Sequence, residues 1–191
     1  MDPDANVYLA KYLNNFTGRS YKKEAFRKLA WYHLLHGKPE LYTKYMQSCI
    51  KLPHALTDED KSAQKEAERG VMPNKDILKA RILFDGEYLD KALLAINAVE
   101  LAKLKKPRDQ VEFYYRKARI LHEMGSLNEA VKTYLLTIQK GSTYEYYFAA
   151  NAALKLAAIF EKQGKKNNAI NYYKMALNLE IALMSVDEAQ I

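Results

Sequence analysis

The segments "HEMGSLNEAVKTY" (122–134) and "EKQGKKNNAINYY" (161–173) decide the fold, because they carry the same residues at the same spacing. In each segment a glycine is followed by alanine five residues later and by tyrosine nine residues later; these are Gly125, Ala130 and Tyr134, then Gly164, Ala169 and Tyr173. A pattern that recurs after a few tens of residues is the signature of a repeat architecture. The two segments therefore predict one structural unit that is used at least twice.

The same spacing extends upstream of these two segments. An alanine lies seven residues before the glycine in the pairs Ala30–Gly37, Ala118–Gly125 and Ala157–Gly164. A further unit contains Ala80, Gly86 and Ala92, where Ala92 follows the glycine by six residues and predicts one extra residue in "GEYLDKA". Ala80, Ala118 and Ala157 recur after 38 and then 39 residues, and Ala92, Ala130 and Ala169 do the same. Two sets of markers that shift together indicate true repeats.

Composition and helical periodicity predict an all-α fold. The chain has 191 residues, of which 49% are hydrophobic, and only 7 Gly and 5 Pro, which disfavours the many turns of a β architecture. We predict a single helical-repeat domain over 1–191. Its segments are a helix of a preceding partial repeat (5–16), a degenerate repeat (20–52), a connection with a short helix (53–73) and three further repeats (74–104, 111–141 and 147–184).

This chain resembles the tetratricopeptide repeat (TPR) family, and more specifically the C-terminal part of larger bacterial TPR proteins of undefined function. The last repeat carries small residues at the helix crossing and near its end, with an aromatic residue between them: Ala157, Gly164, Ala169, Tyr173 and Ala176. The resemblance implies an α–α superhelix, a TPR-like solenoid of about four antiparallel helical hairpins. Small residues let the paired helices approach, and each hairpin buries its apolar face only by stacking on a neighbour.

The resemblance also implies a function as a noncatalytic scaffold for protein–protein interaction. The first helix of each hairpin would line a concave groove that binds a partner protein or peptide with acidic or aromatic residues, since arginine can clamp a carboxylate. The groove positions carried over to this chain are Arg27, Trp31, Arg81, Phe84, Tyr115, Arg119, His122, Asn151, Leu154, Ala158 and Glu161. Trp31 stands where TPR domains that hold chaperone C-termini have asparagine, which argues against that one function.

Two other functions remain open at this level. The net charge is +7, and the first 53 residues hold nine basic and four acidic residues, a local charge of +5. With the run "KLKKPR" (103–108), this surplus would suit a helical-repeat nucleic-acid-binding protein. The basic residues are dispersed among acids, however, which favours a solvated surface. A third interpretation is a structural module whose groove receives repeats that precede this chain.

The sequence offers little for catalysis or metal binding. His33 and His36 are three residues apart, but no third ligand follows at a supporting spacing. No glycine-rich phosphate loop and no nucleophile with an evident base are present, so we expect no enzyme activity and no cofactor. Cys49, the single cysteine, suits a packed position in a helix.

Nothing in the sequence assigns a compartment or an oligomeric state. No apolar run has the ~20 residues that a membrane-spanning helix requires. The first residues, "MDPDANVYLAKYL", have neither the basic nor the apolar region of a signal peptide. The cytoplasm is the default expectation, and export is the expectation if the chain is a fragment that lacks its N-terminus.

Overall fold

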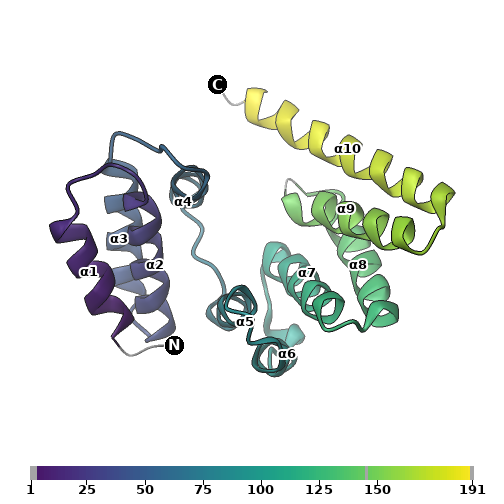
Figure 1. The fold of residues 1–191 in the computed structure, drawn as a ribbon, viewed down its shortest axis with the longest axis horizontal. Helices are drawn as coiled ribbons and strands as arrows, with labels where there is room; N and C mark the ends of the chain where they lie inside the picture. The colour runs from purple at the N-terminus through teal and green to yellow at the C-terminus, as the bar shows by residue number, and fades with distance from the viewer. Residues whose placement is uncertain (1–3, 145, 190–191) are drawn as a thin grey trace. The chain divides into compact units, whose positions relative to one another are not determined.

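All regular structure among the described residues is helical, which confirms the predicted all-α class. The computed structural model describes residues 4–144 and 146–189, with side chains described as far as residue 182. The chain divides into two compact units, Met1–Lys75 and Asp76–Ile191. Figure 1 shows the helices in chain order.

From residue 4 onward, where its description begins, the first unit contains four helices. They are α1 (Ala5–Asn15), α2 (Lys22–Leu35), α3 (Pro39–Lys51) and α4 (Asp58–Glu68). The pair α2 and α3 forms a hairpin, and both α1 and α4 pack against α2 (Figure 1). Pro39 begins α3, where its missing N–H costs no helical hydrogen bond.

Small and apolar side chains of α2 and α3 form the core of this hairpin. Ala30 and Cys49 are fully buried, and Leu29 and Met46 are nearly so. Burial raises the pKa of the Cys49 thiol to about 11, with Lys23 and Arg27 acting in the opposite direction. The thiol is therefore protonated at neutral pH and serves as a packed small side chain.

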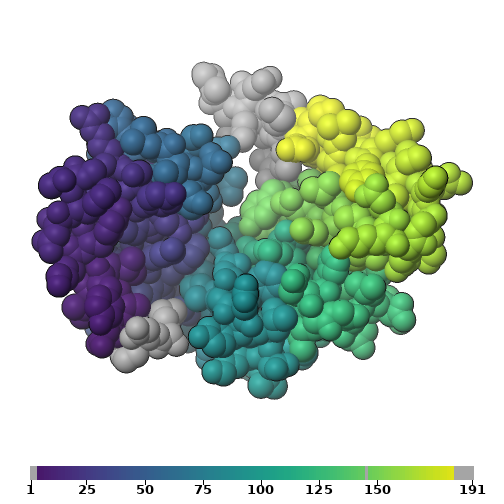
Figure 2. Space-filling model, in the orientation of Figure 1, coloured from purple at the N-terminus to yellow at the C-terminus, as the bar shows by residue number. Residues whose placement is uncertain are grey.

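Six α-helices and one 3-10 turn lie in the described part of the second unit. They are α5 (Lys75–Asp85), α6 (Leu89–Asn97), η1 (Leu101–Lys103), α7 (Pro107–Glu123), α8 (Leu127–Gly141), α9 (Tyr147–Lys162) and α10 (Lys166–Ala189). The helices α7 with α8 and α9 with α10 form hairpins, and α9 also packs on α7 and α8. Figure 2 shows α9 and α10 in contact along the face in view.

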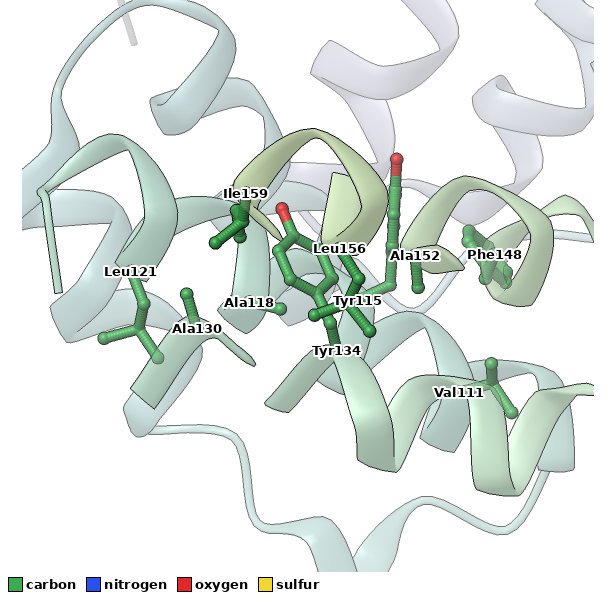
Figure 3. Close-up of a cluster of buried hydrophobic side chains, with 10 residues drawn as sticks. All are labelled: Val111, Tyr115, Ala118, Leu121, Ala130, Tyr134, Phe148, Ala152, Leu156 and Ile159. Atoms are coloured by element: carbon green, nitrogen blue, oxygen red, sulfur yellow. The ribbon is translucent and has the colours of Figure 1, made fainter. Parts of the chain in front are cut away.

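The repeat alanines lie where the helices cross. Ala80, Ala92, Ala118, Ala130 and Ala157 have no exposed surface. In the cluster of Figure 3, Ala118 and Ala130 leave room for the large side chains around them. The cluster also contains Val111, Tyr115, Leu121, Tyr134, Phe148, Ala152, Leu156 and Ile159. The α7–α8 repeat therefore buries its apolar face against α9 of the next repeat, as the stacking argument requires.

The turn of each hairpin contains one residue with a left-handed backbone. The N–H of that residue donates to the carbonyl three residues earlier, and the following N–H donates to the carbonyl five residues before it. Both bonds satisfy carbonyls at the end of the first helix. The four left-handed residues are Gly37, Glu87, Gly125 and Gly164.

The predicted extra residue in the second repeat is wrong. Glu87, and not Gly86, takes the left-handed conformation, with φ of 63°. Counted from Glu87, Ala80 lies seven residues before and Ala92 five residues after, as in the other repeats. The turn has the ordinary length, and its glycine is displaced by one position.

We expect Glu87→Gly to stabilise the protein by roughly 0.5–1 kcal/mol. A left-handed conformation costs a residue with a Cβ about 1–2 kcal/mol, and the greater freedom of glycine in the unfolded chain offsets part of that gain. Urea denaturation followed by circular dichroism measures the change. Gly125→Ala is the reciprocal control: an added Cβ meets no atom within 4 Å, so the expected loss comes from the backbone alone. If Glu87→Gly does not raise the free energy of unfolding, Glu87 is not the left-handed residue of this turn.

Candidate functional site

The structure brings together part of the predicted partner-binding set on the first helices of the second unit. The guanidinium carbon of Arg119, on α7, lies 4.4 Å from the ring centre of Phe84 on α5 and 5.9 Å from that of Tyr115. Arg119 and Phe84 are both half-buried. We call Arg81, Phe84, Arg119 and His122 the Arg119 surface.

Arg119 has no carboxylate partner within the described part of the chain. Its only contacts of a specific kind are the two aromatic rings. A guanidinium that stacks on a ring through its face keeps its N–H groups, which lie in the guanidinium plane, for an acceptor at the edge. Arg119 is therefore held in position while its hydrogen-bond donors remain unused by the protein.

Arg81 adds a second cation to this surface. Its Nε lies 3.7 Å from Asp85 Oδ2, one turn further along α5, and its side chain is about one quarter exposed (23%). This i,i+4 pair is solvent-accessible and contributes little to stability. Arg81 adds positive charge to this surface at a partly exposed position.

His122 lies one turn after Arg119 on α7. Its Nδ1 is 3.4 Å from the hydroxyl of Tyr134, and the two rings meet edge to face. Burial lowers the pKa of His122, and the nearby Lys155 lowers it further, so the ring is neutral at pH 7. Burial also raises the pKa of Tyr134, which stays a neutral donor. At neutral pH the positive charge of this surface therefore comes from its two arginines.

The Tyr115 side chain belongs to the core. It is only 5% exposed, and Figure 3 shows it among the side chains of α9, including Ala152 and Leu156. Burial raises the pKa of its hydroxyl. The residue supports Arg119 through its ring and offers a ligand almost no surface of its own.

The predicted positions on α9 are more exposed. Leu154 is 46% exposed, and Asn151 and Ala158 are half-buried. The Glu161 carboxylate accepts a hydrogen bond of 2.7 Å from the Tyr173 hydroxyl on α10. No contact in the described residues joins these α9 side chains to Arg119.

Arg27 and Trp31 lie beneath α4 in the first unit. Their exposed fractions are 5% and 6%, and both contact Glu66 of α4. A helix that the sequence assigned to a connection thus covers these two positions. They are excluded from any surface that is open in this structure.

The two neighbouring histidines are part of an aromatic cluster. His36 stacks on Tyr32 and contacts its carbonyl through Nδ1 at 2.7 Å, while His33 stacks on Tyr45 of α3. Burial lowers the pKa of His33. Among the described residues, no group of three or more His, Cys, Asp or Glu side chains is placed to hold a metal ion.

Sequence reasoning missed two features of the second unit. Lys155 on α9 lies close enough to His122 to influence its pKa, although the repeat register did not select it. A buried ion-pair cluster of Arg108, Glu112 and Arg116 also went unnoticed. The i,i+4 spacing of Glu112 and Arg116 was a signal, but surface helices carry the same spacing.

Comparison with known proteins places the repeat in the second unit. The family model described as Tetratricopeptide repeat matches residues 111–137, which cover most of α7 and most of α8. No curated protein and no solved structure matches the chain. Within the described residues, none of the helices has both the length and the apolar character needed to cross a membrane. The matched repeat and the all-helical architecture together confirm the predicted α–α superhelix class and support the resemblance to the tetratricopeptide repeat family, whose model matches the α7–α8 hairpin.

Proposed function

We propose that this protein is a noncatalytic scaffold that binds a partner through the Arg119 surface. A TPR assignment by itself supports a role in protein–protein interaction. The ligand that suits this surface is an unfolded or flexible protein segment with a carboxylate side chain next to an aromatic or apolar side chain. The carboxylate would bind Arg119, and the neighbouring side chain would pack beside Phe84.

The observation that carries this proposal is the stacked guanidinium of Arg119 without an acceptor. Ordering a long side chain normally costs conformational entropy on binding. Here Phe84 and Tyr115 have already restricted Arg119, so less entropy is lost when a ligand binds. A carboxylate can then accept two parallel N–H bonds from the planar guanidinium group of Arg119. A lysine ammonium group could not donate such a pair.

Local charge supports the choice of an acidic ligand. Arg81 and Lys155 surround the same part of α7, and His122 is neutral there at pH 7. Such a concentration of positive charge raises the association rate of acidic segments and lowers that of basic ones. The proposal therefore requires a preference for acidic over basic peptides and a marked dependence on salt.

We expect the double variant Arg81→Glu, Arg119→Glu to bind acidic peptides at least about 100-fold more weakly, because two attractive charges become repulsive. The measurement is fluorescence anisotropy with labelled peptides of acidic–aromatic, basic and uncharged composition. Circular dichroism checks that helical content is unchanged.

Lys132→Glu with Lys174→Glu is the matched control. It makes the same change in net charge at two exposed positions, on α8 and α10. If both double variants weaken peptide binding equally, the effect comes from the net charge of the protein and not from the Arg119 surface. Unchanged binding in the arginine variant would reject the Arg119 surface as the binding site.

A further inference from the structure

In the first unit, α4 covers two of the positions that the sequence assigned to the partner-binding groove, Arg27 and Trp31. The repeat register aligns Arg27 and Trp31 of α2 with Tyr115 and Arg119 of α7. On α7, Tyr115 packs against α9, the first helix of the next repeat. On α2 the corresponding place is taken by α4, whose sequence "DEDKSAQKEAE" is largely charged.

The contacts between α2 and α4 are mainly polar. Only Asp60, Ala63 and Ala67 of α4 are buried, and two of these three side chains end in a single methyl group. Apolar burial therefore contributes much less here than in the hairpins, where leucine, phenylalanine and tyrosine fill the core. What holds α4 on α2 is a small set of directional bonds.

Two of those bonds form a receptor for a carboxylate at the start of α2. The backbone N–H groups of Tyr21 and Glu24 donate to the two oxygens of Asp60, at 2.7 and 3.0 Å. Asp60 thus caps α2 from another helix, and no side-chain cap is supplied locally by Tyr21. The bonds use backbone atoms, so any carboxylate in this position could form them.

A second receptor lies two turns further along α2. Trp31 Nε1 donates to Glu66 Oε1 at 2.8 Å, and Arg27 Nη1 lies 3.6 Å from Glu66 Oε2. Arg27 also donates to Ser62 Oγ at 2.9 Å and stacks on the Trp31 ring. Indole and guanidinium together hold one carboxylate of α4.

The arrangement defines the ligand that this surface accepts. Asp60 and Glu66 are six residues apart on α4, and Ala63 and Ala67 lie between and beside them on the same helical face. The recognised pattern is an amphipathic helix with two carboxylates at this spacing and small residues facing α2. Such a helix from a partner protein could form the carboxylate contacts that Asp60 and Glu66 of α4 form.

We propose that α4 is an internal competitor, which an acidic amphipathic helix of a partner protein displaces from Arg27, Trp31 and the N-terminus of α2. Residues 52–57 and 70–74 flank α4 and contain neither helix nor strand, so α4 can leave without unwinding its neighbours. Displacement exchanges equivalent polar bonds, and it unfolds neither α2 nor α3. The partner surface is distinct from the Arg119 surface and does not depend on it.

The test uses the full chain and a synthetic peptide of residues 56–70 as the probe. Ser62→Ala with Glu66→Ala weakens α4 without altering α2. Trp31, the only tryptophan, reports on the covered surface. We expect this variant to emit at longer wavelength and to bind the peptide at least about tenfold more tightly than the unmodified chain.

Two peptide variants provide the matched control. Glu66→Gln in the peptide should abolish binding, whereas Glu68→Gln should leave it unchanged, because Glu68 is exposed and bonds only to Gln64. Equal affinity of the two variant peptides, or no binding of the native peptide to the weakened chain, overturns the proposal.

Hydrogen exchange on the unmodified chain gives a second readout. The amides of α4 should exchange before those of α2 and α3, and peptide addition should leave α2 protected while α4 becomes faster. Exchange of α4 only together with α2 and α3 would show that α4 is a permanent part of the core and would overturn the proposal.

Discussion

Replacing Glu112 with alanine is expected to lower the free energy of unfolding by about 3–5 kcal/mol, because it leaves a buried arginine without its carboxylate. Glu112 is 4% exposed and Arg116 is 5% exposed. Glu112 Oε1 accepts bonds from Arg116 Nε and Nη2 at 3.1 and 2.9 Å, and Oε2 lies 3.1 Å from Arg108 Nη1. Removal of the carboxylate leaves the charge of Arg116 desolvated and largely uncompensated.

The partner groups of Arg116 explain why it cannot lose its charge instead. Burial alone would lower the pKa of Arg116, but the Tyr147 hydroxyl and the Glu112 carboxylate raise it. The Tyr147 hydroxyl, on α9, accepts a bond of 3.2 Å from Arg116 Nη2. This single neutral acceptor remains in the alanine variant and compensates only part of the loss.

Urea denaturation followed by far-ultraviolet circular dichroism measures the effect. Glu100→Ala is the matched control, because Glu100 pairs with Lys103 on the surface at 2.7 Å and should change stability by less than about 0.5 kcal/mol. Glu112→Leu with Arg116→Met removes both charges, and we expect it to recover most of the stability. If Glu112→Ala behaves like Glu100→Ala, the cluster is more hydrated than its burial indicates.

The same cluster illustrates what the sequence could not predict. Period and composition identify helices and the small residues at their crossings, because those features depend on local spacing. Whether an i,i+4 pair such as Glu112 and Arg116 is buried depends on the next helix, here α9. A sequence pattern contains no direct information on that contact.

The turn at Glu87 shows that prediction from sequence is also limited within a local turn. Glycine is the residue expected in a left-handed position, so Gly86 was a reasonable choice from sequence. The hydrogen bonds place the turn at the neighbouring glutamate. Natural turns tolerate the strain of one such residue when the packing around it, including Ala80 and Ala92, determines the register.

The candidate site was predictable only in part, for a related physical reason. The repeat register selects equivalent positions in every hairpin, and two of them, Phe84 and Arg119, are in contact in the structure. It also selects Arg27 and Trp31, which α4 covers. The charged sequence of α4 has a thin apolar face, so hydrophobicity gave no sign that it would dock.

Asp60→Ala is expected to cost about 3 kcal/mol in the first unit. Asp60 has no exposed surface, and its carboxylate accepts two backbone bonds at the N-terminus of α2. Hydrogen bonds to a charged group contribute roughly 1.5–3 kcal/mol each, and the freed N–H groups of α2 regain part of this from water. Asp60→Asn keeps the shape and one acceptor, so we expect about half of that loss.

Thr57→Ala tests the capping of α4 separately from the capping of α2 by Asp60. Thr57 Oγ1 accepts a bond of 3.1 Å from the Asp60 N–H, which makes Thr57 the N-cap of α4. The expected loss is about 1 kcal/mol, typical of an N-cap. The Asp60 carboxylate accepts bonds from the N-terminus of α2 and makes no return bond to Thr57, so Thr57 alone caps α4.

Two readouts distinguish unfolding of the unit from release of α4 in the Asp60→Ala variant. Urea denaturation followed by Trp31 fluorescence measures the loss of the whole unit. Emission in buffer without urea measures whether Trp31 has lost its cover from Glu66. If α4 can leave α2 as proposed, the loss of stability cannot exceed the free energy of α4 docking, and native emission shifts to longer wavelength. A lower urea midpoint with unchanged native emission would mean instead that α4 and α2 unfold only together.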